Sequence, residues 1–244
     1  MNEVKKLNIE IILKRKVELE GKIFITGFHG IGYAGYIAVN HIIESTNAEL
    51  LGYVTTEQYP PIVSLDENRV LTPYELFMYK DFILFLPRFQ PPPSEQNDLM
   101  RILTEWTVKN RFKEAILIGG LDSKLKAGEE KLRVVPTSQF KMNNKLELKK
   151  LDRNLYVVGP LAILLAYYEI KDFPAIALLP YAQRGRPDPL AAATAIQVIN
   201  QLYDLDISTE QLIKDAKQIE QEIAQLKEQE EKVQREPGSL AMYV

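Results

Sequence analysis

A glycine-rich stretch near the N-terminus limits the possible folds of this chain more than any other feature. Ile23 to Thr26 form a short apolar, β-branched run of the kind that a buried strand needs. Apolar residues at helical spacing follow from Tyr33 onward. Between the two runs, four glycines fall within nine residues: Gly27, Gly30, Gly32 and Gly35. We expect a strand, a tight turn and a helix, the opening unit of an α/β domain, because glycine adopts positive φ and allows a helix to approach a strand closely.

The same stretch has the spacing of the dinucleotide-binding fingerprint. Residues 30–35 match Gly-x-Gly-x-x-Gly, and Glu57 follows a second apolar run, 50–54, near the place of a ribose-binding acid. In that fingerprint the strand leads directly into the first glycine, whereas Gly27-Phe28-His29 intervene here. We therefore predict a structural turn, and nucleotide or small-molecule binding at this turn by an enzyme is the alternative.

The composition of the 244-residue chain excludes several classes of function. The length allows one sizeable α/β domain plus an appendage. A formal net charge of -3 offers no general attraction to nucleic acid or to an anionic membrane surface. The sequence has no cysteine for disulfides or thiolate chemistry, and its two histidines, His29 and His41, leave little for a zinc or iron site. We expect neither a metal nor another cofactor.

Two further observations favour a cytoplasmic protein. The N-terminal residues Met-Asn-Glu-Val-Lys-Lys lack the apolar core of a secretory signal. The longest apolar run, 155–168, is interrupted by Gly159-Pro160 and is too short to span a bilayer. We therefore expect a cytoplasmic protein with no membrane and no nucleic-acid partner.

Short apolar runs alternate with helical patterns along most of the chain, which predicts a mostly parallel sheet with helices on both faces. Proline-rich residues 59–61 and 69–73, and charged residues 121–131, are expected to be loops. The expected strands are 9–13, 23–26, 50–55, 82–86, 115–118, 132–136, 155–158 and 175–179.

Helix-capping patterns place three helices after the glycine-rich unit. Ser94 stands where an N-cap is expected, and Pro160 stands at the start of an apolar helix ending at Tyr168. Asp188 is placed to cap a third helix, which Pro189 opens. The nearby Arg184 and Arg186 can bind an anion at this helix terminus or form ion pairs, and we favour ion pairs.

The C-terminal part of the chain predicts one long helix. Ser208-Thr-Glu-Gln211 has the pattern of a capping box. The apolar residues that follow are spaced as in a heptad seam, and a helix from Ser208 to Arg235 is about 40 Å long. This helix packs on its own domain or pairs with another subunit. We predict a homo-oligomer with three of the seam residues at or near the subunit contacts: Ile219, Ile223 and Leu226.

These patterns divide the chain into an α/β core domain at 1–206, a projecting helix at 207–236 and a flexible tail at 237–244. Pro237-Gly238 ends the helix, and the last residues are Met242-Tyr243-Val244.

Several motifs, in order along residues 20–235, resemble those of the PAC2 (proteasome assembly chaperone 2) family. They are Gly27-Phe28-x-Gly30-x-Gly32-x-x-Gly35, Tyr59-Pro60-Pro61, Gln90-Pro91-Pro92, the segment ending in Gly119-Gly120, Val158-Gly159-Pro160, and Arg184-Gly-Arg-Pro-Asp-Pro-Leu-Ala-Ala192. The resemblance implies a core related to the purine nucleoside phosphorylase architecture without that enzyme's activity. It also implies homo-oligomers and, for archaeal members, assembly or activation of the 20S proteasome.

The family's functional element in such members is a C-terminal tail of a hydrophobic residue, tyrosine and any residue. Met242, Tyr243 and Val244 match that pattern residue by residue. The resemblance therefore implies a non-catalytic protein, with no catalytic residues to assign, whose tail binds the α-subunits of the 20S core particle.

Overall fold

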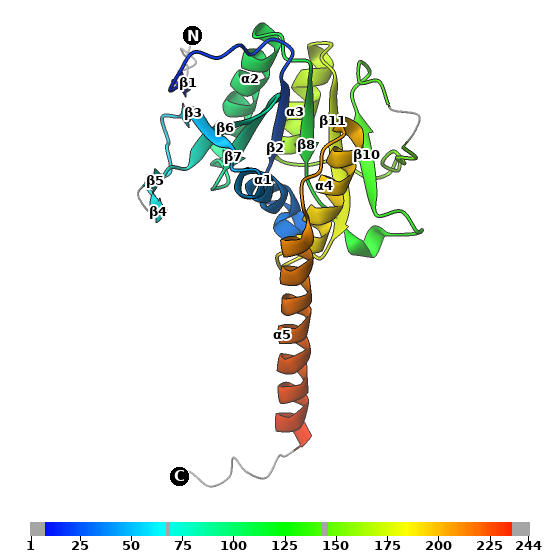
Figure 1. Ribbon diagram of the computed structural model, residues 1–244. Coiled ribbons are helices and arrows are strands. Elements are labelled where there is room, and N and C mark those ends of the chain that lie inside the picture. The colour runs from blue at the N-terminus through cyan, green and yellow to red at the C-terminus, as the bar shows by residue number, and fades with distance from the viewer. Residues whose placement is uncertain (1–7, 67–68, 143–145, 236–244) are drawn as a thin grey trace, which may run out of the picture.

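The computed structural model describes residues 8–66, 69–142 and 146–235, with side chains up to residue 225, and these ranges contain a nine-stranded sheet flanked by helices (Figure 1). The strand order is β1-β3-β6-β7-β2-β8-β11-β10, and β9 pairs with β11. The strands of this sheet are β1 (Glu10–Leu13), β2 (Ile23–Gly27), β3 (Glu49–Thr55), β6 (Tyr74–Tyr79), β7 (Phe82–Pro87), β8 (Glu114–Ile118), β9 (Leu121–Asp122), β10 (Leu132–Pro136) and β11 (Ala175–Ala182).

The predicted α/β class with a mostly parallel central sheet is confirmed. The four central strands β7, β2, β8 and β11 run parallel to one another. Antiparallel pairs β1–β3, β3–β6 and β6–β7 extend the sheet on one side, and β10 pairs antiparallel with β11 on the other. Strand β7 has no exposed residue, as expected for a strand covered on both faces.

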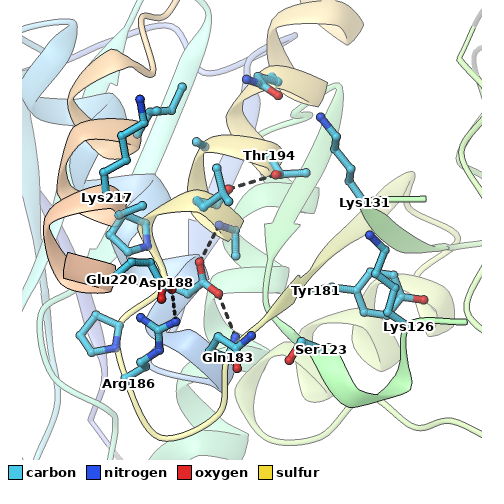
Figure 2. A pocket seen from close by; sticks show the side chains of 18 of the residues that line it. Ser123, Lys126, Lys131, Tyr181, Gln183, Arg186, Asp188, Thr194, Lys217 and Glu220 are labelled. Carbon is cyan, nitrogen blue, oxygen red and sulfur yellow. Dashed lines mark hydrogen bonds and ion pairs between the residues drawn. The ribbon is translucent and has the colours of Figure 1, made fainter. Parts of the chain in front are cut away.

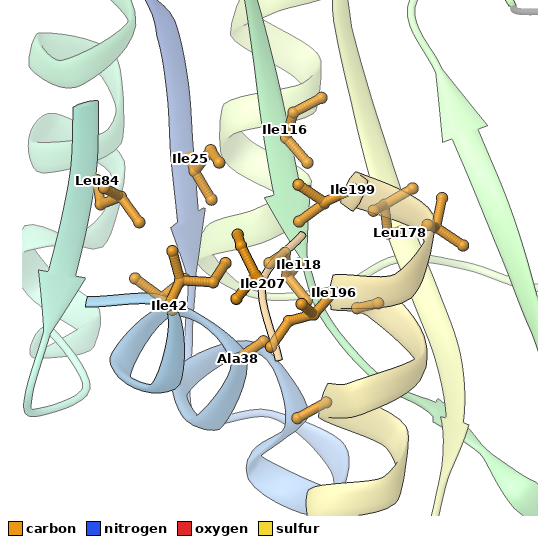
Figure 3. Close-up of a cluster of buried hydrophobic side chains, with 14 of the residues drawn as sticks. Ile25, Ala38, Ile42, Leu84, Ile116, Ile118, Leu178, Ile196, Ile199 and Ile207 are labelled. Atoms are coloured by element: carbon orange, nitrogen blue, oxygen red, sulfur yellow. The ribbon is translucent and has the colours of Figure 1, made fainter. Parts of the chain in front are cut away.

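Helices cover both faces of this sheet, as predicted. One face packs against α1 (Ala34–Ser45) and α4 (Pro189–Tyr203), and the other against α2 (Pro93–Lys109) and α3 (Pro160–Ile170). Figure 3 shows the first of these layers, in which Ile25 and Ile118 of the sheet lie near Ala38 of α1 and Ile196 of α4. No helix within the described ranges combines the length and hydrophobicity needed to cross a lipid bilayer.

One predicted strand and parts of two predicted loops were wrong, and one strand was not predicted. Residues 155–158 form irregular chain, because β11 is already paired with β8 and β10, and Tyr156 is 84% exposed. Strand β6 was not predicted, because Glu75 interrupts its apolar pattern. The loop expected at 69–73 instead contributes a strand to a small hairpin. This hairpin consists of β4 (Ser64–Asp66) and β5 (Arg69–Leu71). The charged segment 121–131 likewise contains β9 and the 3₁₀ turn η2 (Ser123–Leu125).

Helix α2 begins one residue earlier than its predicted cap. Its N-cap is Pro92 and its first residue is Pro93. The Ser94 hydroxyl instead donates to the side chain of Gln58 (2.8 Å), so it attaches a loop to the helix. The caps predicted for α3 and α4 are confirmed, because Pro160 and Pro189 open their helices and the Asp188 carboxylate accepts from the Ala191 amide (3.0 Å).

Helix α5 (Glu210–Arg235) leaves the body and projects from it (Figure 1). Its 26 residues correspond to about 39 Å at 1.5 Å per residue. The predicted capping box is present only in part. The Ser208 hydroxyl accepts weakly from the Glu210 amide (3.4 Å), but the Gln211 side chain donates to Asp215 rather than returning to Ser208.

A fully buried carboxylate, Glu75 of β6, holds the second strand of the β4–β5 hairpin and the residue after it against the sheet. It accepts from Arg69, from Arg88 (3.0 and 3.1 Å) and from the Thr72 amide (3.1 Å). Two guanidinium groups therefore offset the cost of removing this charge from water.

We predict that Glu75→Gln lowers the free energy of unfolding by about 3 kcal/mol, because two partly buried cations lose their counter-charge. Glu20→Gln is the matched control, since Glu20 pairs with Arg111 at 3.5 Å with both side chains well exposed. The control is expected to change stability by less than about 1 kcal/mol. Equal effects in urea denaturation would show that the Glu75 network does not stabilise the fold.

Candidate functional site

The glycine turn is a place of close backbone approach between β2, α1 and β8. A Cβ on Gly27 would lie 2.3 Å from the carbonyl oxygen of Gly35, in the first turn of α1. A Cβ on Gly35 would lie 2.2 Å from the carbonyl oxygen of Ile118, at the end of β8. Contacts this short exclude any side chain, so these two glycines allow α1 to pack directly on the strand ends.

Gly32 connects the glycine turn to the loop before α4. Its φ is +64°, and a Cβ there would lie 2.7 Å from Cβ of Ala182 and 3.0 Å from Cβ of Asp188. The Asp188 amide donates to the Gly32 carbonyl (2.8 Å). Gly30 differs from the other three, because a Cβ there would meet nothing within 4 Å.

The acidic partner predicted for a nucleotide at this turn lies elsewhere. Glu57 follows β3, and β7 and β6 both separate β3 from β2 in the sheet order. Glu57 accepts from the amide of Asn8 (3.3 Å). The Gly30 amide also has a partner, because it donates to the Phe28 carbonyl (2.8 Å). The fingerprint residues are therefore not arranged as a dinucleotide site. Within the described residues, no group of three or more histidine, aspartate and glutamate side chains could hold a metal ion.

Asp188 and the two arginines beside it join the turn, α4 and α5. The Asp188 carboxylate caps α4 and also accepts from the Gln183 amide (2.8 Å). Arg184 donates to Asp122 (3.1 Å), and Arg186 pairs with Glu220 of α5. The ion pairs that we favoured over an anion site are therefore confirmed.

The segment before α5 and the first turn of that helix are fixed to the body by polar and apolar contacts. The His41 ring nitrogen Nε2 lies 2.7 Å from the Ser208 carbonyl oxygen. The Asn200 side chain accepts from the amide of Ile207 (3.1 Å) and donates to its carbonyl (2.9 Å). Leu212 is buried in the core. The direction of the long helix is thus set by residues on α1 and α4.

A groove lies beside this anchored segment, and we call it the α4–α5 groove (Figure 2). Its volume is about 810 Å³, and it is bounded by α4, α5, Tyr181 of β11 and the segment after η2. Apolar residues supply much of its lining, including Leu190, Ala193, Ile213 and Ala216. Three lysines also line it, Lys126, Lys131 and Lys217. The groove was not predicted from the sequence, because its residues come from three separate segments, 123–131, 181–197 and 213–221.

The residues predicted to bind partners lie partly along α5 and partly outside the described residues. Ile219 and Ile223 are half-buried on α5. The side chain of Leu226 lies outside the described residues, as do Met242, Tyr243 and Val244. The interface and tail assignments therefore stay predictions.

His29 lies inside the glycine turn among aromatic rings. It stacks on Tyr36 with ring centroids 4.2 Å apart and meets Tyr33 edge-on at 5.7 Å. Its Nδ1 is buried and has no hydrogen-bond partner within the described part of the chain. Burial lowers the pKa of His29 below its ordinary value of 6.5, because the imidazolium form loses water without gaining a partner.

Comparison with known proteins identifies the family. The model of the PAC2 family matches residues 24–227. This chain belongs to the PAC2 family. Among solved structures, the PAC2-family chain is similar to PbaA of Pyrococcus furiosus, described as an archaeal homologue of proteasome-assembly chaperone. The two are 26% identical with a TM-score of 0.80, over 97% of this chain and 99% of PbaA.

Two further proteins are similar to this chain. PbaB of the same organism, described as an archaeal proteasome activator, shares the fold with a TM-score of 0.74 at 19% identity, over 92% of this chain and all of PbaB. The protein MJ0106 of Methanocaldococcus jannaschii, which is uncharacterised, is 27% identical over 229 residues, 91% of this chain and 92% of its own length. The resemblance noted from the sequence motifs is thus confirmed at the level of the family.

The contacts at the glycine turn predict that the same substitution, glycine to alanine, destabilises the protein at one position and hardly affects it at another. Gly35→Ala should lower the free energy of unfolding by at least about 2 kcal/mol, because the new methyl group overlaps the Ile118 carbonyl. Gly30→Ala should change stability by less than about 0.5 kcal/mol, because that methyl group enters open space. Thermal and urea denaturation of both variants test this, and a Gly35→Ala protein as stable as the wild type would contradict the close approach.

The burial of His29 predicts a loss of stability in weak acid. The unfolded chain binds a proton near pH 6.5, whereas the folded chain binds it only at lower pH. Stability is therefore full above about pH 6.5 and falls as the pH drops toward the folded pKa. His29→Phe keeps a ring on Tyr36 but cannot titrate, so its stability should decrease less between about pH 7.5 and about pH 5.5. The same pH dependence in both proteins, measured by urea denaturation, would exclude His29 as the cause.

Proposed function

We propose that this PAC2-family protein is a non-catalytic partner of the 20S proteasome that docks its C-terminal tail on the α-subunits of the core particle. Support comes from the similarity to PbaA, which is described as a homologue of a proteasome-assembly chaperone. Support also comes from Met242-Tyr243-Val244, which fits the tail pattern of a hydrophobic residue, tyrosine and any residue. The proposal implies a cytoplasmic location beside the proteasome.

The projection of α5 is the observation that carries this proposal. The helix is anchored at Ser208 and Leu212 and then extends away from the sheet (Figure 1). Arg235 ends it nine residues before the last residue of the sequence. A segment carried on such a helix can reach a partner's pocket without a clash between the two folded bodies.

The chemistry of the last three residues suits a pocket on another protein. The terminal carboxylate of Val244 can form a charge-assisted bond with a lysine in a partly desolvated site. Met242 offers an adaptable apolar contact, and Tyr243 can bury its ring while its hydroxyl finds a polar partner. One tail alone should bind weakly, because ordering a free segment offsets much of the contact energy. A homo-oligomer with Ile219, Ile223 and Leu226 at its contacts would present several tails and so raise the avidity.

A structural role, rather than nucleotide binding or catalysis, is the better interpretation of the glycine turn. Gly27, Gly32 and Gly35 stand at close backbone contacts, and Glu57 is separated from the turn by two strands. These observations support a structural role for the turn in positioning α1 and, through Asp188, α4.

We predict that Tyr243→Ala abolishes binding to the 20S core particle, because it removes the ring that the pocket would bury. One residue added after Val244 should do the same, because it displaces the terminal carboxylate. Both variants should keep the wild-type fold and oligomeric state. Pulldown of purified core particle and surface plasmon resonance measure the binding.

Tyr156→Ala is the matched control, because Tyr156 is a highly exposed tyrosine on the body. It should bind the core particle like the wild type. Undiminished binding by both tail variants would remove the tail from the mechanism, and a titration with ATP and dinucleotides would then test the glycine turn.

A further inference from the structure

A second pocket lies at the carboxyl ends of the four central parallel strands, and we call it the strand-end pocket. Its volume is about 460 Å³. Small-molecule sites in proteins commonly have volumes of about 300 to 1,000 Å³, so this pocket has the size of such a site. Each of the four strands contributes a residue from the loop that follows it: Gln90 after β7, His29 after β2, Gly120 after β8 and Arg184 after β11.

The topology of the sheet places this pocket where two neighbouring chain segments diverge. The chain leaves β2 through α1, which packs on one face and leads to β3 on the β1 side of the sheet. The chain leaves β8 toward β10 and α3, and α3 packs on the other face and leads to β11. The loops after these two adjacent parallel strands therefore separate. In open α/β sheets, ligands bind in the crevice that such a separation leaves.

The pocket has a buried apolar floor and an exposed apolar rim. Ile118, Leu121 and Leu161 line the floor, and each is at most 6% exposed. At the rim, Tyr156 and Val158 are 84% and 80% exposed. An apolar ligand in the pocket would cover part of this rim, and the removal of apolar surface from water favours its binding.

The charges in the pocket wall are already paired. Asp122 and Arg184 line the pocket, and Nε of Arg184 donates to the Asp122 carboxylate at 3.1 Å. Burial lowers the pKa of His29 below 6.5, so its ring is neutral at neutral pH. Among the described residues that line the pocket, no other side chain carries a charge. A charged ligand would lose water without gaining a counter-charge, so the wall favours an uncharged one.

Two lining residues can contact a ligand because they have no other role in the fold. The Gln90 side chain lines the pocket and hydrogen-bonds to no other described residue, and its amide both donates and accepts. Gly30 also lines the pocket, and it is the one glycine of the turn where a Cβ would meet nothing within 4 Å. A glycine without a packing contact, at the wall of a pocket, leaves the backbone open to a ligand.

A small molecule fits this pocket better than an extended peptide of a partner. An extended peptide binds by adding a strand to a free sheet edge. The two strands at the centre of the pocket have no free edge, because β2 pairs with β7 and β8, and β8 pairs with β2 and β11.

We propose that the strand-end pocket binds a small uncharged organic molecule with an apolar body and one polar group. The apolar body lies on the floor beside Gly30, and the polar group hydrogen-bonds to the Gln90 side chain. Tyr156 and Val158 cover the bound molecule at the rim. The proposal assigns no reaction, does not depend on docking to the proteasome and is tested separately from it.

Fluorescence titration of the full-length protein tests the binding and the charge preference. The probe is N-phenyl-1-naphthylamine, an uncharged aromatic amine whose fluorescence rises in apolar surroundings. It should bind saturably with one probe per chain. 1-Octanol should displace it at a concentration at least tenfold lower than octanoate, which has the same chain length and a negative charge. The absence of saturable binding, or equal displacement by the alcohol and the carboxylate, would overturn the proposal.

Substitutions in the wall test the location of the site. Gly30→Leu should raise the dissociation constant of the probe at least tenfold while leaving the circular dichroism unchanged, because the new side chain takes up space in the pocket. Leu125→Lys should also weaken binding, because it adds an unpaired charge at the rim.

Leu190→Lys is the matched control for Leu125→Lys. Both leucines are partly exposed, at 55% and 43%, but Leu190 lines the α4–α5 groove instead. It should leave probe binding unchanged. Undiminished binding by Gly30→Leu and Leu125→Lys, or an equal loss with Leu190→Lys, would place the probe elsewhere and overturn the proposal. Gln90→Leu should raise the displacing concentration of 1-octanol at least threefold, and no change would overturn the assignment of Gln90.

Discussion

The contact between Gly32 and Asp188 is the constraint on which the rest of the structure depends. One backbone hydrogen bond and the close approach of the Asp188 side chain to the Gly32 backbone hold the turn after β2 against the segment that starts α4. Asp188 then directs α4 through its cap, and Arg186, two residues earlier, reaches Glu220 on α5. Because no side chain fits at Gly32, this network links the first central strand to the last helix over a very short distance. The packing of α4 on the sheet and the direction of α5 therefore both depend on this contact.

Local chemistry allowed much of this architecture to be predicted from the sequence. Asp188-Pro189 and Gly159-Pro160 indicated helix starts correctly, because a cap or a first-turn proline depends only on neighbouring residues. The continuous apolar run of β7 indicated a strand covered on both faces for the same reason. Features that depend on the pairing of distant segments were not predicted. Residues 155–158 have the composition of a strand, but no edge of β11 is free to pair with them.

A buried charge explains another failure of prediction, the strand β6. Glu75 breaks the apolar pattern of β6, and the cations Arg69 and Arg88, brought in from other segments, make its burial tolerable together with the Thr72 amide. The candidate site was predictable to a similar degree. The glycines and the arginine ion pairs were found from local patterns, whereas the α4–α5 groove was not, because it is assembled from segments that are far apart in the sequence.

Because α5 is long, a small rotation of the helix where it joins the body produces a large displacement at its far end. A rotation of a few degrees about Ser208 moves the end of a helix of about 39 Å by about 3 Å, which is nearly the diameter of a water molecule. The His41, Asn200 and Arg186 contacts resist that rotation, although all three lie far from Arg235. Substitutions at these positions can therefore redirect the end of the helix without touching it. In this protein, a small change in the angle of α5 at Ser208 therefore produces a much larger displacement at Arg235.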